Sequence, residues 1–149
     1  MSAHSEWDAR FLRMAREIAT WSKDPSTKVG AVIADPKNRI VSLGYNGLPR
    51  SVADTAHRLT DRRLKYKIMV HAEENAVLFA GRPLQFCSIY VWPFAACAHC
   101  ASLIIQVGIN RVVTPGCPQD KLERWGEDMA IAEEMYKEAD IRYIILDGA

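Results

Sequence analysis

The chain has 149 residues, of which 49% are hydrophobic and 25% are charged, and its formal net charge is +1. This length predicts one domain over residues 1–149, and it is enough to bury about 70% of the unfolded surface without a disulfide or a metal to hold the core. The composition excludes a collagen, a low-complexity disordered chain and a disulfide scaffold, and the near-neutral charge argues against nucleic acid as the main partner.

The beginning of the chain predicts a cytoplasmic protein whose first element is a helix. No apolar run approaches the roughly 18–20 residues of a membrane span, and the charged N-terminal segment lacks the apolar stretch of a secretory signal. Apolar residues recur at helical spacing from Trp7 to Ala19, and Ser5 is in position for an N-cap. The helix is expected to end near Asp24-Pro25, because a residue before proline avoids the α region.

The rest of the chain alternates predicted strands and helices, separated by turn residues. The expected elements are, in chain order, a strand at 29–34, a strand at 40–44, a helix from 71 to 80, a strand at 88–91, a helix at 98–107, a strand at 111–114, a helix at 120–139 and a strand at 141–146. Strands that alternate with helices after a hairpin predict an α/β fold. We expect a single-domain layered sheet of about five strands with helices on both faces, parallel in its second half.

A long irregular stretch from Tyr45 to about Val70 interrupts this pattern. Loops of this length are uncommon in a compact domain and are usually functional. A short basic helix is expected within it, formed by Arg58, Arg62, Arg63, Lys65 and Lys67. Such a run predicts either a solvated helix face or a surface that binds single-stranded nucleic acid. His57 lies beside this run, and the sequence is compatible with either a substrate contact or a simple surface position for it.

The chain has four cysteines, of which Cys97 and Cys100 form a Cys-x-x-Cys pair. Without an export signal, structural disulfides are not expected, and a close pair is a candidate for metal binding or redox chemistry. Cys87 and Cys117 stand alone and are predicted to be small buried hydrophobes.

Ligand-type side chains stand at the starts of two predicted helices. His71 opens one helix, and Cys97 and Cys100 open the other. A histidine and two thiolates are good zinc ligands, and three protein ligands leave a fourth position for water, as in a catalytic site. An open α/β sheet normally places its site where helices begin, so His71 meets the cysteines if the two βα units are neighbours.

Two acidic residues follow His71. Zinc lowers the pKa of its bound water to about 7, and the resulting hydroxide needs a partner for its proton. Glu73 is placed to lean over that water without binding the metal, whereas Glu74 has the spacing to His71 of a di-iron ligand pair. The sequence holds no second carboxylate–histidine set, so Glu73 is predicted to be the catalytic residue and Glu74 a first-turn carboxylate stabilised by the helix dipole.

The His-x-Glu and Cys-x-x-Cys elements resemble the signature of the zinc-dependent nucleobase deaminases. Further blocks look like those of the deoxycytidylate (dCMP) deaminases within the cytidine/deoxycytidylate deaminase superfamily. They occur in family order within about residues 5–115, at 24–31, 44–47, 71–76 and 100–109. One departure is Ala96, where the family usually has a proline before the first cysteine. Proline is no ligand, so the resemblance still implies zinc.

The resemblance implies hydrolytic deamination of dCMP to dUMP and ammonia by a cytidine deaminase-like fold. Zinc held by His71, Cys97 and Cys100 activates the water that attacks the amino-bearing carbon of cytosine. Glu73 protonates the ring nitrogen and then carries a proton to the departing ammonia.

The resemblance also implies contacts to the rest of a small-molecule nucleotide. In the family, the asparagine of Gly-Tyr-Asn-Gly, here Asn46, contacts the sugar, and the segment with Ser26 lies beside the nucleotide pocket. A phosphate needs a cation or a nest of backbone donors, for which Lys28 and Arg50 are the candidates. Family members are generally homo-oligomers, so assembly is expected.

Three other interpretations remain open. A deaminase of another small base or nucleoside, such as cytosine, cytidine or guanine, keeps the fold and the metal, and a polynucleotide deaminase would use the basic run near 58–67. A silent interaction module would keep only the metal. The blocks before His71 favour a nucleotide, and Glu73 argues against the silent module, because a structural zinc site has no use for it.

Overall fold

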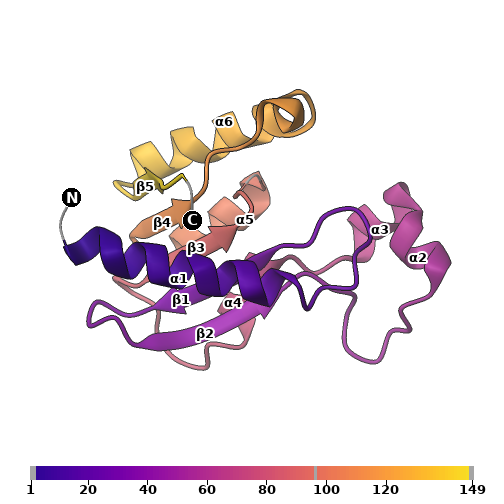
Figure 1. Ribbon diagram of the computed structural model, residues 1–149, viewed down its shortest axis with the longest axis horizontal. Coiled ribbons are helices and arrows are strands. Elements are labelled where there is room, and N and C mark those ends of the chain that lie inside the picture. The colour runs from indigo at the N-terminus through magenta and orange to yellow at the C-terminus, as the bar shows by residue number, and fades with distance from the viewer. Residues whose placement is uncertain (1–2, 96, 148–149) are drawn as a thin grey trace.

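The computed structural model describes residues 3–95 and 97–147. They form an α/β fold around one five-stranded sheet with the strand order β2-β1-β3-β4-β5 (Figure 1). The strands are β1 (Gly30–Ala34), β2 (Ile40–Tyr45), β3 (Ser88–Trp92), β4 (Arg111–Thr114) and β5 (Arg142–Ile145). The helices are α1 (Ala3–Ala19), α2 (Ala56–Thr60), α3 (Arg62–Ile68), α4 (Ala72–Leu78), α5 (Ala98–Gln106) and α6 (Leu122–Glu138), with a short 3₁₀ helix η1 (Gln119–Lys121).

The sheet is mixed. β1 pairs antiparallel with β2 and with β3, whereas β4 runs parallel to both of its neighbours, β3 and β5. Asp35 fixes the turn between β1 and β2, because its Oδ1 accepts the backbone N–H groups of Lys37 and Arg39, both at 2.9 Å. The predicted α/β sheet with a parallel second half is confirmed.

Helices cover both faces of the sheet, as expected. α1 packs on one face, and α4, α5 and α6 lie on the other (Figure 1). β1 is buried throughout, and its successive side chains point to opposite faces. Val32 packs among residues of α1, whereas Ala31 and Ile33 pack among residues of α4, α5 and α6. None of the described helices is long and apolar enough to cross a membrane.

Two glycines allow helices to approach the sheet closely. A Cβ at Gly30 would lie 2.0 Å from the carbonyl oxygen of Ala15 in α1, and a Cβ at Gly44 would lie 2.6 Å from both the Ala72 oxygen and the Ala76 nitrogen in α4. Neither position has room for a side chain. The contact at Gly44 fixes the first turn of α4 against β2, next to His71.

The limits of the first helix differ from the prediction. α1 includes Ser5 rather than starting after it, and it ends at Ala19, several residues before Pro25. Three residues beyond Ala19 continue in a turn of i→i−3 hydrogen bonds that ends at Ser22. The Ser22 hydroxyl then donates to the carbonyl oxygen of Asn46 at 2.9 Å, so a contact with a distant segment draws the chain away from the helix axis.

The long stretch from 45 to 70 contains two short helices, α2 and α3, that project beyond one end of the sheet (Figure 1). The short basic helix expected near 58–67 is therefore confirmed only in part: α3 carries Arg62, Arg63, Lys65 and Lys67, whereas Arg58 lies in α2. Asp61 separates the two helices: its backbone N–H donates to the His57 oxygen at the end of α2, and its side chain accepts the Leu64 N–H at the start of α3.

Candidate active site

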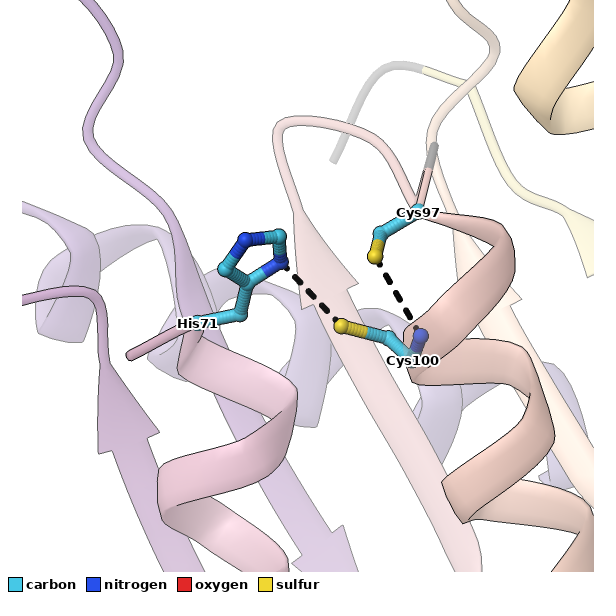
Figure 2. A group of neighbouring side chains, drawn as sticks. All are labelled: His71, Cys97 and Cys100. Atoms are coloured by element: carbon cyan, nitrogen blue, oxygen red, sulfur yellow. Dashed lines mark hydrogen bonds between the residues drawn. The ribbon is translucent and has the colours of Figure 1, made fainter. Parts of the chain in front are cut away.

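The three predicted metal ligands meet where two helices begin. His71 is the N-cap of α4 and Cys97 is the N-cap of α5, with Cys100 in the first turn of α5. One donor atom from each residue lies within 4.8 Å of the others. Figure 2 shows the three side chains pointing toward one another, with the His71 Nδ1 atom 3.2 Å from the Cys100 Sγ atom.

Local hydrogen bonds hold these residues in place. The backbone N–H of His71 donates to Glu74 Oε1 at 2.8 Å, so Glu74 caps α4 as a first-turn carboxylate and is absent from the cluster of donor atoms. The Cys97 Sγ accepts the backbone N–H of Cys100 at 3.2 Å (Figure 2). From α6, Asp128 accepts the backbone N–H of Ala98 at 2.9 Å and so ties the start of α5 to a second helix.

The three donor groups shift one another's pKa values. Hydrogen bonding from Cys100, together with the His71 ring, lowers the pKa of Cys97 to about 4. Hydrogen bonding to Cys97 raises the pKa of His71 to about 9. Hydrogen bonding to Cys97 is also the larger cause, and burial the smaller, of a raised pKa for the Cys100 thiol. A cation at this point deprotonates a coordinating thiol outright. One imidazole and two sulfurs are a donor set that Zn²⁺ prefers.

Glu73 lies beside the ligands without joining them. Glu73 is only 5% exposed, and it lines a cavity together with His71 and Cys97. Burial raises the pKa of its carboxyl group to about 7, against the opposing effect of the His71 charge. A carboxyl group with this pKa exchanges a proton readily near neutral pH, which is what a general acid and base requires.

The wall of this cavity comes from segments far apart in the sequence. Besides the starts of α4 and α5, it includes the loop between α1 and β1, the residue after β2, α3, the loop after β3 and the start of α6. Among the predicted substrate residues, Ser26 and Asn46 line it. Lys28 does not: it lines a neighbouring hollow, and its Nζ donates to the Ser22 carbonyl oxygen. Arg50 lies outside both, with its guanidinium carbon 5.7 Å from the centre of the Phe79 ring.

Asn46 is held rigidly at the cavity wall. Its Oδ1 accepts the backbone N–H of Val29, and its Nδ2 donates to the Thr27 carbonyl oxygen, both at 2.9 Å. A second, longer contact joins its Nδ2 to Asp24 Oδ2 at 3.4 Å. The buried amide therefore connects the loop before β1 with the end of β2.

Lys65 is a site residue that the sequence analysis missed. It is 6% exposed and lines the cavity, so the solvated face expected for the basic run is wrong at this position. Its Nζ donates to Asp24 Oδ1 at 2.9 Å and to Ser26 Oγ at 2.6 Å. Burial alone would raise the pKa of Asp24, but the hydrogen bonds from Lys65 and from the backbone of Ser26 and Thr27 lower it.

Aromatic side chains form another part of the cavity wall. Tyr66 of α3 and Trp125 of α6 line the cavity with their ring centres 6.4 Å apart, and the ring centre of Phe94 lies 6.4 Å from that of Trp125. Arg124 also lines the cavity and lies over both the Tyr66 and the Trp125 ring. No local motif surrounds Arg124 or Trp125, so only the packing of α6 reveals them.

The remaining predicted positions lie away from the cavity. His57 is exposed, 3.9 Å from Asp61, and does not line the cavity. Cys87 is buried and Cys117 is half-buried. Ala96, which replaces the usual proline of the family, lies outside the described residues.

Comparison with known proteins connects these features with a family. The model of the cytidine and deoxycytidylate deaminase zinc-binding region matches residues 5–115. An uncharacterized deaminase from the luxG 3′ region of Aliivibrio fischeri is 48% identical over 137 residues, which are 92% of this chain and 91% of that protein. The deoxycytidylate deaminases of Mus musculus and Homo sapiens are 41% and 40% identical over 114 residues; the match covers 72% of this chain and 64% of each relative.

Solved structures share the fold. The apo dCMP deaminase of the cyanophage S-TIM5 has a TM-score of 0.74 at 16% identity, over 95% of this chain and 98% of that one. A guanine deaminase from Nitrosomonas europaea has a TM-score of 0.56 at 14% identity, over 93% of this chain and 74% of that one. These likenesses confirm the predicted cytidine deaminase-like fold. The chain therefore belongs to the family of cytidine and deoxycytidylate deaminases, whose zinc-binding region extends over residues 5–115.

Proposed function

We propose that the chain is a zinc-dependent hydrolase that converts dCMP to dUMP and ammonia. The observation that carries this proposal is that a cluster of three zinc-type donors and the buried carboxylate of Glu73 adjoin one cavity. Support for the nucleotide comes from the mouse and human relatives, which are deoxycytidylate deaminases 40–41% identical to this chain.

His71, Cys97 and Cys100 would hold the zinc ion. When bound, zinc acts as a Lewis acid that lowers the pKa of water to about 7. The chain itself contributes two sulfurs at the start of α5, where the positive end of the helix dipole stabilises thiolates. The caps provided by Glu74 and Asp128 keep both helix starts in position as the ligands bind.

Glu73 is proposed to move the protons. It takes a proton from the water that adds to C4 and passes it to N3 of the cytosine ring. It then takes the proton of the new C4 hydroxyl group and passes it to the amino nitrogen, so that the C4–N bond breaks and ammonia leaves as the C4 carbonyl forms. Glu73 is two residues beyond His71 in the first turn of α4, so its carboxylate and the metal ligand open into the same cavity. Its burial keeps bulk water from competing for these protons.

Other cavity residues are proposed to orient the nucleotide. Phe94, on the loop between β3 and α5, offers a ring face for the base. Asn46 and Ser26 face the sugar side. One lone pair of the Asn46 Oδ1 is taken by the Val29 N–H, which leaves the other for a substrate hydroxyl.

The experiment that tests this proposal compares substrates. Ammonia release by zinc-loaded protein is measured with dCMP, CMP, deoxycytidine, cytosine, guanine and a cytosine-containing single-stranded oligonucleotide. We expect kcat/KM to be highest for dCMP, by about tenfold or more. Release from guanine, from a free base or from the oligonucleotide, with none from dCMP, contradicts the proposal. The homo-oligomer remains a prediction, which light scattering after size exclusion measures.

A further inference from the structure

A stacked arginine stands at the wall of the cavity. The guanidinium carbon of Arg124 lies 4.8 Å from the centre of the Trp125 ring and 5.4 Å from the centre of the Tyr66 ring, and all three residues line the cavity. Stacking uses the faces of a guanidinium and leaves its N–H edge available for a planar or tetrahedral anion. The two rings therefore orient the cation without consuming its hydrogen-bond donors.

The other cations near the cavity are already engaged or point elsewhere. Lys65 also lines the cavity, but it is bound to Asp24 at 2.9 Å. Lys28 lines the neighbouring hollow, and Arg50 lies against Phe79. Among the described residues no carboxylate forms an ion pair with Arg124. Arg124 is therefore the cavity cation with its charge still available.

The local field also favours an anion at this point. Besides partial burial, the nearby positive charge of Arg62 lowers the pKa of Arg124, while Asp24 acts in the opposite sense. The Asp24 carboxylate is itself neutralised by Lys65. A bound anion would relieve the repulsion between the two arginines.

We propose that Arg124 selects a phosphorylated nucleotide over the corresponding nucleoside by binding the substrate phosphate at the cavity wall. This inference rests on the proposed function, because it concerns the same cavity. Two parallel N–H···O bonds from one guanidinium match the spacing of phosphate oxygens. Arg124 and Trp125 lie beyond residues 5–115, so the region that matches the family does not include them.

The test compares Arg124→Gln with the unchanged protein on two substrates, dCMP and deoxycytidine. Arg124→Gln removes a pair of charge-assisted hydrogen bonds, so we expect kcat/KM for dCMP to fall by about 10- to 100-fold, mainly through a higher KM. The kcat/KM for deoxycytidine, which has no phosphate, should be nearly unchanged. Arg124→Lys keeps the charge without the planar fork and should recover part of the loss. Arg63→Gln, on the exposed face of α3, is the matched control and should change kcat/KM for dCMP by less than about fivefold.

A binding measurement separates this inference from the proposed function. Calorimetry with zinc-loaded protein compares dUMP with deoxyuridine and needs no turnover. Selective weakening of dUMP binding in Arg124→Gln supports the inference even if neither substrate releases ammonia, an outcome that would refute only the proposed function. Equal losses for both substrates, a loss in Lys28→Gln instead of Arg124→Gln, or no dUMP binding by the unchanged protein would overturn it.

Discussion

The buried pair between Lys65 and Asp24 should be a main support of the cavity wall, and Lys65→Met tests this. The two side chains are 8% and 6% exposed. Removing one partner of such a pair costs about 3–5 kcal/mol, because the other charge stays buried. Asp24 keeps the backbone N–H groups of Ser26 at 2.8 Å and Thr27 at 3.3 Å, so we expect the lower end, about 3 kcal/mol. For a chain of this size that is roughly 6–12 °C in Tm.

Urea unfolding followed by circular dichroism measures the loss. Lys67→Met, an exposed lysine two positions along α3, is the matched control and should stay within about 0.5 kcal/mol of the unchanged protein. In an Asp24→Asn background, Lys65→Met should cost much less, because no carboxylate is then left unpaired. Equal urea midpoints for Lys65→Met and Lys67→Met would show that the Lys65–Asp24 pair does not stabilise the cavity wall.

Three further predictions concern packing, metal and pH. Gly30→Ala should destabilise the protein by at least about 3 kcal/mol in thermal unfolding, because the added Cβ would lie 2.0 Å from the Ala15 oxygen. Gly126→Ala in α6 is the contrasting variant: its Cβ has nothing within 4 Å outside the local helix backbone, so it should stabilise the protein by up to about 1 kcal/mol. Cys100→Ser should hold less than the single zinc equivalent of the unchanged protein in a metal assay after dialysis, and full retention would refute its role as a ligand. The pKa of Asp24 is lowered below its ordinary value of 3.8, so its contribution to stability is present above about pH 4 and is lost as the pH falls through the lowered pKa; in Asp24→Asn that part of the acid dependence should be missing from urea titrations.

The fold follows largely from short-range signals. The buried strand Gly30–Ala34, the turn at Asp35 and the alternation of strands and helices all reappear in the structure. The end of α1 was misplaced, because Pro25 sets only an outer limit for a helix. The contact from Ser22 to Asn46, 24 positions away, determines the actual end, and no local pattern encodes it.

The metal site was predictable because its chemistry is local. His71 with Glu73, and Cys97 with Cys100, each lie within one helix turn, and their residue types limit the chemistry. The rest of the cavity depends on tertiary packing. Lys65 resembles its exposed neighbours in sequence, and only the approach of α3 to the loop before β1 turns it inward.

The central claim is that Glu73 carries protons beside a zinc ion held by the three ligands. Its most direct test is to measure zinc content and dCMP turnover in the same preparations of the unchanged protein and Glu73→Gln. We predict that the variant folds, keeps about one zinc per chain and loses roughly 10²–10⁴-fold in kcat, since the amide fills the same space but cannot exchange the proton. Full turnover by a zinc-loaded Glu73→Gln variant would contradict the claim.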